Sequence, residues 1–216
     1  MANNTGERIA EVFDGYAEVY DDITTKAQYF ILAWIPRHIQ DIGALDQCSV
    51  LDLGCGTGLN VKVLCEQREG IHAEGVDVSP HMIEKARAGK QYQKLYVHDL
   101  TKPLPYISSA SFDLVMAMSF LDYLPDVSTC LSECYRFLKS NGTLWASFRR
   151  FEAEDEGSPP RHVTAYGLKF TGYSAGEIRH MMQRAGICVI TVDALTGYIT
   201  PGGFPCPYYV VRARKP

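Results

Sequence analysis

The chain contains no pair of cysteines spaced as C-x-x-C, although seven of its 216 residues are cysteine. That absence disfavours zinc ribbons and thioredoxin-like redox motifs, and Cys130 and Cys134 suit packing on one helix face better than metal binding. A disulfide framework is also unexpected in a chain of this size without a secretory signal peptide. We therefore expect reduced cysteines, no metal and a cytoplasmic location.

Long apolar runs and an excess of positive charge are also missing. The apolar stretch over residues 29–35 is too short to cross a bilayer and ends at Pro36. The net charge of −4 and the isoelectric point of about 5.9 offer no basic field to nucleic acid or to an anionic membrane. These features favour a small-molecule partner over nucleic acid or a membrane, and they leave a monomer and a homodimer open.

Two common nucleotide-binding motifs are absent as well. No segment matches the phosphate loop G-x-x-x-x-G-K-[ST]. In the segment VLDLGCGTG, residues 50–58, the glycines alternate, and Leu59 stands where the third glycine of the dinucleotide motif G-x-G-x-x-G would fall. A phosphate-loop enzyme and a nicotinamide dehydrogenase are therefore disfavoured. The alternating glycines still let the backbone approach a ligand closely.

Acidic residues close two apolar runs and mark the ends of predicted strands. Asp52 lies in the run that opens into the glycines, and Asp77 ends the run over residues 75–77. The carboxyl ends of neighbouring parallel strands meet at one edge of a sheet, where ligands bind in open α/β folds. A carboxylate there can accept hydrogen bonds from both ribose hydroxyls. Together these features predict a site for a cofactor that carries a nucleoside.

Strand and helix patterns alternate along the middle of the chain, which is typical of a doubly wound α/β fold with a mostly parallel sheet. Two helices are expected before this series, at residues 7–22 and 25–42, and the second should be interrupted near Pro36. The series itself should have strands at 49–53, 71–76, 95–97, 112–118 and 143–148, with helices at 59–67, 80–88 and 126–138.

The pattern changes after the fifth expected strand. An exposed loop is expected at residues 152–160 and an extended segment at 162–170, followed by a helix at 175–185. The last two strands are expected at 187–192 and 208–213. The connection between them is too rich in glycine and proline for a crossover helix, so these two strands should pair antiparallel. No internal repeat is evident, and we expect one structural unit.

Several segments, in this order, resemble the motifs of class I S-adenosylmethionine (SAM) dependent methyltransferases. Residues 50–58 look like motif I, residues 75–79 like the acidic ribose site, and residues 98–100 like the adenine-binding step. Residues 112–115, followed by 119–124, resemble motif IV of the small-molecule branch. That branch includes the ubiquinone/menaquinone and malonyl-carrier-protein methyltransferases.

The resemblance implies a Rossmann-like, seven-stranded sheet whose last strand is antiparallel and lies between the fifth and sixth strands. It also implies SAM as the cofactor, a SAM-binding domain of residues 46–216 and an N-terminal helical lid of residues 1–45. The implied activity is methyl transfer from SAM to a small molecule. Many relatives of the small-molecule branch carry a histidine where this chain has Asp122-Tyr123, which leaves the subfamily open.

The resemblance also assigns roles to individual residues. The glycines of the turn should border the methionine part of SAM, and Asp52 should hold the turn or meet the amino group. Asp77 should accept both ribose hydroxyls, and Asp99 should accept from the adenine amino group. Tyr16 and Tyr20 of the lid should face the sulfonium. The predicted cofactor-binding residues are Tyr16, Tyr20, Asp52, Gly54, Cys55, Gly56, Gly58, Asp77, Val78, Met82, Asp99, Leu100, Met118 and Ser119.

Substrate residues are expected after the fourth strand and in the irregular segment before the last helix, as in relatives. The arginine among them could clamp a carboxylate, and a histidine with its ordinary pKa of about 6.5 suits a general base. The predicted substrate-binding residues are Phe120, Asp122, Tyr123 and Arg149. The predicted catalytic residues are His162 and Tyr166.

The acceptor stays open at this point. A base is needed only where the acceptor must lose a proton before it attacks, as a hydroxyl does, whereas a neutral amine or a carboxylate needs none. A protein or RNA methyltransferase is an alternative, although the signature [DN]-P-P-[YF] is missing where Ser119-Phe120-Leu121-Asp122 stands. A non-catalytic SAM-binding partner protein is a third hypothesis.

Overall fold

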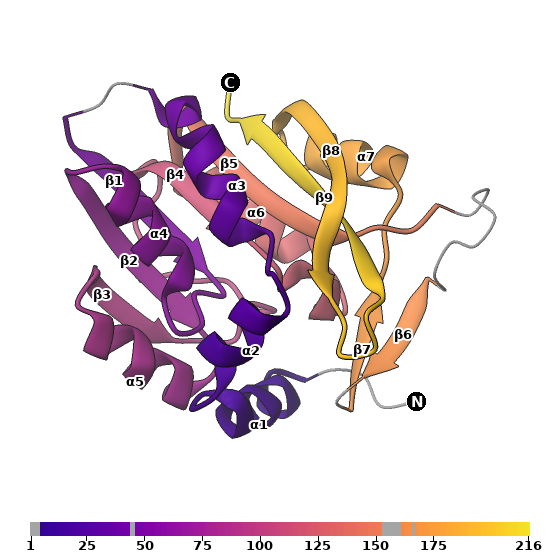
Figure 1. The fold of residues 1–216 in the computed structure, drawn as a ribbon. Helices are drawn as coiled ribbons and strands as arrows, with labels where there is room; N and C mark the ends of the chain where they lie inside the picture. Colours follow the sequence, from indigo (N-terminus) through magenta and orange to yellow (C-terminus); the bar gives the residue numbers. More distant parts are fainter. Residues whose placement is uncertain (1–4, 44–45, 153–160, 166) are drawn as a thin grey trace.

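A computed structural model describes residues 5–43, 46–152, 161–165 and 167–216, and its centre is a seven-stranded sheet with helices on both faces (Figure 1). The order of strands is β3-β2-β1-β4-β5-β9-β8. Their bounds are β1 Cys48–Leu53, β2 Ile71–Asp77, β3 Tyr92–Val97, β4 Phe112–Ala117, β5 Leu138–Arg149, β8 Cys188–Ile199 and β9 Pro205–Arg214.

The last strand of the chain lies inside the sheet. β9 pairs antiparallel with β5 on one side and with β8 on the other, whereas the strands from β3 to β5 pair parallel. The predicted fold class is therefore confirmed, including the antiparallel insertion of the final strand. β8 and β9 extend several residues beyond the expected bounds because the two strands pair along almost their whole length.

Helices surround this sheet, and their starts follow local sequence signals. Ser79 caps α5, since its Oγ accepts the N–H of Met82 at 3.0 Å, and Pro80 occupies the first helical position. The helices are α1 Gly6–Tyr16, α2 Tyr20–Lys26, α3 Ile31–His38, α4 Leu59–Gln67, α5 Pro80–Gly89, α6 Ser128–Phe137 and α7 Ala175–Arg184, with short 3-10 helices η1 Ile39–Ile42 and η2 Leu121–Tyr123. Among the described helices, none has both the length and the hydropathy needed to cross a bilayer.

Packing on both faces explains why the central strands read as continuous apolar runs. On one face, Trp34 of α3 meets Trp145 of β5 edge to face, with ring centroids 5.1 Å apart. On the other face, Phe137 of α6 is fully buried and meets Phe112 of β4. The sheet is therefore held rigid from both sides, and the ends of its strands have fixed positions.

The two N-terminal helices predicted from sequence are broken differently in the structure. The helix expected at 7–22 is divided into α1 and α2, and the one expected at 25–42 breaks at Gln28, whose φ is 52°. The backbone turns there because Phe30 donates its N–H to the carbonyl of Gly197 in β8 at 2.9 Å. Pro36 lies inside α3 and does not interrupt it.

The extended segment expected at 162–170 is a β-hairpin. β6 His162–Ala165 and β7 Leu168–Thr171 pair antiparallel and form a separate two-stranded sheet. Leu168 and Phe170 of β7 pack against Ile9 of α1 in a small apolar cluster. The hairpin therefore supports the first helix, which the sequence patterns did not indicate.

The register of the sheet brings three strand ends together. Leu53 at the end of β1 pairs with Val76 on one side and with Ala117 on the other. The glycine turn that follows β1 therefore lies between Asp77, which ends β2, and residues 118–119, which follow β4. This is the juxtaposition that the acidic strand ends predicted.

Phe137→Ala should lower the free energy of unfolding by about 3–5 kcal/mol, because it leaves a large cavity under the sheet. Phe204, which is 72% exposed, provides the matched control, and Phe204→Ala should change stability by less than about 0.5 kcal/mol. Urea denaturation followed by far-UV circular dichroism measures both. Equal effects of the two substitutions would contradict the described core.

Candidate functional site

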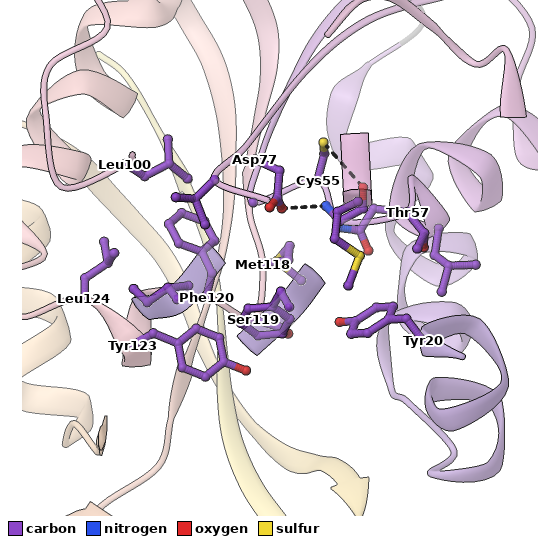
Figure 2. A pocket seen from close by; sticks show the side chains of 18 of the residues that line it. Tyr20, Cys55, Thr57, Asp77, Leu100, Met118, Ser119, Phe120, Tyr123 and Leu124 are labelled. Atoms are coloured by element: carbon purple, nitrogen blue, oxygen red, sulfur yellow. Dashed lines mark hydrogen bonds between the residues drawn. The ribbon is translucent and has the colours of Figure 1, made fainter. Parts of the chain in front are cut away.

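The turn after β1 needs glycine where it passes close to the segment after β4. Gly54 has a φ of 66°, and a Cβ at this position would lie 2.6 Å from the ring of Phe120. Gly58, with a φ of 94°, marks the start of α4. Between them, the backbone N–H of Gly56 donates to the carboxylate of Asp77 at 2.8 Å (Figure 2).

Asp77 joins the turn to the start of α5. Its Oδ2 accepts the N–H of Gly56, and its Oδ1 accepts the N–H of Ser79 at 2.9 Å. Burial raises the pKa of this carboxyl above its ordinary value, and the backbone hydrogen bonds oppose that shift. The backbone of Val78 also donates to this carboxylate, which has about four acceptor positions and so keeps capacity for a ligand.

Asp52 lies beneath the turn and does not line the pocket described below. It is fully buried, and its carboxylate accepts hydrogen bonds from the Tyr92 hydroxyl at 2.7 Å and from Nδ2 of Asn60 at 3.4 Å. Burial raises its pKa to about 7, although these two donors lower it. Of the two roles expected for Asp52, the geometry fits holding the turn, because the side chain ties β1 to α4 and β3.

A pocket, called here the central pocket, opens over the carboxyl ends of β1, β2 and β4 (Figure 2). The sequence-predicted residues that line it are Tyr20, Gly54, Cys55, Gly56, Asp77, Val78, Met82, Asp99, Leu100, Met118, Ser119, Phe120 and Tyr123. The glycine turn and Asp77 therefore share one crevice with the segment after β4.

One end of the central pocket carries Met82, Asp99 and Leu100. Oδ1 of Asp99 accepts hydrogen bonds from the N–H and hydroxyl of Thr101, at 3.0 and 2.7 Å. Burial raises the pKa of Asp99, but these donors and Lys102 outweigh burial and hold it below its ordinary value. A charged acceptor and two apolar side chains at this end suit a flat heterocycle that carries an amino group.

The other end is formed by residues from three separate segments. Tyr20 comes from α2, Tyr29 from the turn before α3, and Tyr123 from η2. Ser119, which also lines this end, has a φ of 63°, and its N–H donates to Oγ of Ser147 at 2.7 Å. The left-handed backbone at this non-glycine residue is uncommon, and the contact with Ser147 helps to hold it.

Helices α1 and α2 cover the central pocket and are attached to its rim by acidic side chains. Oδ1 of Asp14 accepts hydrogen bonds from the hydroxyl of Ser79 at 2.5 Å and from the N–H of His81 at 3.1 Å. The hydroxyl of Thr57 donates to Asp21 at 2.6 Å. The helices therefore meet the glycine turn and the start of α5, the two segments that hold Asp77.

Besides Asp52, two predicted cofactor-binding residues, Tyr16 and Gly58, are not among the residues that line the central pocket. Tyr16 is half-buried on α1 beside the pocket, since the helix ends there and α2 carries the pocket-lining Tyr20. Gly58 serves the backbone at the start of α4. Tyr166 lies outside the described residues.

Two predicted substrate-binding residues are buried behind the central pocket. Asp122 is fully buried, and its Oδ2 accepts the hydroxyl of Tyr208 at 2.8 Å. Arg149 is only 6% exposed and lies near Asp122. Burial raises the pKa of Asp122, and the positive charge of Arg149 lowers it. Neither residue is among those that line the central pocket, and the role of Arg149 as a clamp on a substrate carboxylate stays a prediction.

His162 lies in a second hollow, which Tyr123 separates from the central pocket. This side hollow is lined by His162, Arg161 and Lys169 among others, and its walls at Tyr123 and Leu124 are shared with the central pocket. Slight burial and the positive charges of Lys169 and Arg161 hold the pKa of His162 below its ordinary value. His162 is not among the residues that line the central pocket, and its expected role as the base stays a prediction.

Sequence reasoning also missed part of the lining. The amphipathic stripe of the first helix contains Ile9 and Phe13, and it could have suggested both. Tyr29 left no signal, because its position depends on the chain reversal at Gln28. The missed lining residues are Ile9, Phe13, Tyr29, Thr57, Leu59, Asn60 and Leu124.

Comparison with known proteins gives a family match over the centre of the chain. Residues 51–146 match the model of the methyltransferase domain family. The chain is 34% identical over 110 residues to a ubiquinone biosynthesis O-methyltransferase of Xylella fastidiosa, covering 48% of this chain and 42% of that protein. It is 32% identical over 125 residues to a trans-aconitate 2-methyltransferase of Azoarcus sp., covering 58% of this chain and 46% of that protein. The chain thus spans about half the length of these curated relatives.

Solved structures share the fold at lower identity. A chain in the complex between the Haloferax volcanii Trm112 methyltransferase activator and a methyltransferase aligns with a TM-score of 0.72 at 22% identity, covering 94% of this chain and 97% of that one. The Burkholderia thailandensis 1,6-didemethyltoxoflavin-N1-methyltransferase aligns with a TM-score of 0.72 at 17% identity, covering 100% and 92%. That structure contains 1,6-didemethyltoxoflavin and S-adenosylhomocysteine (SAH).

The free energy of unfolding of the wild-type protein should fall as pH rises, because Asp52 ionises. Asp52→Asn should abolish that decrease. The carboxyl has a pKa of about 7 when folded and 3.8 as its ordinary value, so the folded protein binds a proton that the unfolded chain has released. The contribution of Asp52 to the free energy of unfolding is greatest below about pH 4. Between about pH 4 and pH 7 it falls by at most about 1.4 kcal/mol per pH unit. Urea denaturation of both proteins from pH 5 to pH 8 should show the variant gaining on the wild type, and parallel profiles would contradict the assignment.

Proposed function

We propose that this chain is a methyltransferase that binds SAM in the central pocket and transfers its methyl group to a small-molecule acceptor. One observation carries the proposal. Asp77 and the glycine turn face the same crevice as Met118 and Ser119, so carboxyl ends of neighbouring parallel strands converge on one ligand site.

The residues present fit the cofactor. The turn at Gly54 and Gly56 has no side chain that would keep a ligand away from the backbone, and a Cβ at Gly54 would fill space taken by Phe120. Asp77 has lone pairs for two ribose hydroxyls, and Asp99 has an acceptor for an adenine amino group. Met82 and Leu100, both almost fully buried, provide apolar surface for a ring.

The proposed reaction asks mainly for alignment and for a dry site. The cofactor, when bound, supplies a methyl group already activated by a positively charged sulfur. The protein's part is to orient the acceptor in line with that methyl group, which contributes on the order of 7–11 kcal/mol in well-aligned reactions. The ring of Tyr20 is positioned to face a sulfonium, since aromatic faces attract cations.

We further propose that residues 1–45 act as a lid. Ile9 and Phe13 of α1 and Tyr20 of α2 line the central pocket, so a ligand of nucleoside size enters or leaves only when these helices move. These helices are held by side-chain hydrogen bonds and ion pairs at the rim, among them Lys85 with Glu18 at 2.5 Å, and by the apolar packing of Ile9 against Leu168 and Phe170. Such polar contacts at a surface exchange readily with water, which suits a segment that opens and closes.

A small-molecule acceptor is favoured over a macromolecule. The curated relatives with 34% and 32% identity are named for a ubiquinone-pathway and a trans-aconitate methyltransferase, and the net charge of −4 offers no basic surface to RNA. One structural neighbour was solved in complex with an activator protein, so a protein partner remains an alternative. All seven cysteines are free thiols, in keeping with the proposed cytoplasmic location.

Extracts of a host incubated with the protein and methyl-labelled SAM should carry enzyme-dependent label in the small-molecule fraction. The matched control is the same extract with Asp77→Ala. Label that appears instead in precipitated protein or RNA would favour the macromolecular alternative. Tight SAM binding with no label in any fraction would favour the non-catalytic partner.

Wild-type protein should bind SAH, and Asp77→Ala should raise the dissociation constant roughly 30-fold or more. The reason is that losing a buried, hydrogen-bonded charge contact costs about 2 kcal/mol or more. Isothermal titration calorimetry measures the affinities, with Glu66→Ala on the exposed face of α4 as the control. Equal affinities in wild type and Asp77→Ala would count against the proposed site.

A further inference from the structure

The tyrosine end of the central pocket has a distinct chemical character. Tyr20, Tyr29 and Tyr123 converge there with Ser119, and these four residues are called here the acceptor chamber. Figure 2 shows the hydroxyls of Tyr20 and Tyr123 directed into the space beside Ser119. Among the described residues that line the whole pocket, the ionisable groups are carboxyls, phenols and a thiol, without lysine, arginine or histidine.

The phenols of the chamber are held neutral and in fixed orientation. Burial, followed by neighbouring negative groups that include Asp122, raises the pKa of Tyr29 and Tyr123 above the ordinary value. The ring of Tyr123 is fixed between Phe13 and Phe170, with centroids 5.5 and 4.7 Å away in edge-to-face contacts. The chamber therefore presents ring faces and neutral hydroxyl oxygens, not phenolates.

A buried carboxylate with an unused oxygen lies directly behind the chamber. Oδ2 of Asp122 accepts the Tyr208 hydroxyl, whereas Oδ1 is buried and has no hydrogen-bond partner among the described residues. A buried acceptor without a donor is costly unless something else in the functional state compensates it. Arg149 lies near Asp122 and compensates part of its charge, and a positive charge bound beside Tyr29 and Tyr123 would add to that compensation through the low-dielectric interior.

Resting on the proposed function, we propose that the methyl acceptor is an amine nitrogen, which the acceptor chamber binds with Asp122 as the buried counter-charge. The nitrogen would donate its N–H to the hydroxyl oxygens of Tyr29 or Ser119 and lie against the ring faces. Aromatic faces and phenolic oxygens are the groups that recognise alkylammonium ions in proteins.

An amine fits the bond changes that this chamber can support. An amine that arrives protonated first gives one proton to solvent water, because an ammonium has no lone pair. The nitrogen lone pair then forms the new N–C bond, the C–S bond breaks with its electron pair left on sulfur, and the positive charge passes from sulfur to nitrogen. The product ammonium then loses one proton to water. Charge that appears on nitrogen meets ring faces, hydroxyl oxygens and Asp122, all of which stabilise a cation.

The other acceptor classes fit the chamber less well. A hydroxyl acceptor would need a group to take its proton, and the neutral phenols of Tyr20, Tyr29 and Tyr123 cannot do so at neutral pH, because their pKa values are raised. A carboxylate or phenolate acceptor would bring a negative charge towards Asp77 and Asp122 with no lining cation to neutralise it.

Binding of three isosteres to the SAH-saturated protein tests this inference without turnover. Choline carries a quaternary ammonium, 3,3-dimethyl-1-butanol has the same shape without charge, and 3,3-dimethylbutanoate is the anion. We expect choline to bind roughly tenfold or more tightly than either of the others, as measured by calorimetry. No detectable choline binding, or equal binding of choline and the neutral alcohol, overturns the amine assignment.

Two variants assign the preference to the chamber. Asp122→Asn should reduce the choline preference to within about threefold, whereas Glu66→Gln, which removes one charge from the surface of α4, should leave it intact. Tyr29→Leu, which removes a ring face, should also reduce it, with Tyr106→Leu on the exposed loop as its control. An unchanged preference in both chamber variants overturns the assignment.

The same titrations separate this inference from the proposed function. If SAH binds to the wild type and choline shows no preference, the amine assignment fails and the proposed methyltransferase function stands. If SAH itself does not bind, the proposed function fails, and the inference built on it fails as well.

Discussion

The carboxylate of Asp77 holds together the part of the molecule on which the site depends. It accepts one N–H from the glycine turn after β1 and one from the start of α5, while its own backbone ends β2. Three segments that are far apart in sequence are thereby fixed around one buried charge. Backbone donors stabilise that charge against the cost of burial, and Asp77 also lines the central pocket.

The buried ionisable side chains around the site are mostly carboxyls. Asp52 and Asp122 are fully buried and Asp77 nearly so, and burial raises the pKa of all three. Each has hydroxyl, amide or backbone donors, and Arg149 is the buried cation that lies near one of them. Such an interior attracts positively charged ligands, and a sulfonium together with an amine acceptor is one pair that meets this condition.

Sequence patterns were most reliable where a local signal sets the structure. The acidic ends of β1 and β2, the glycine turn and the Ser79-Pro80 helix start all follow from short-range rules, and each lies where it was expected. The positions of Tyr29, His162 and Arg149 depend instead on long-range contacts. A backbone bond from Phe30 to β8 turns Tyr29 inward, and the β6–β7 pairing carries His162 to the far side of Tyr123. Neither contact can be predicted from the periodicity of the sequence.

The place of β9 in the sheet has a consequence for biosynthesis. β9 follows β5 and β8 in the chain, yet it fills the gap between them, and it pairs with β5 over Thr143 to Arg149. Until β9 has been synthesised, the edge of β5 therefore stays unpaired and open to association with other chains. Shortening the chain by even this one strand would leave a gap in the interior of the sheet, so a ribosome-stalled or prematurely ended product should need chaperone protection.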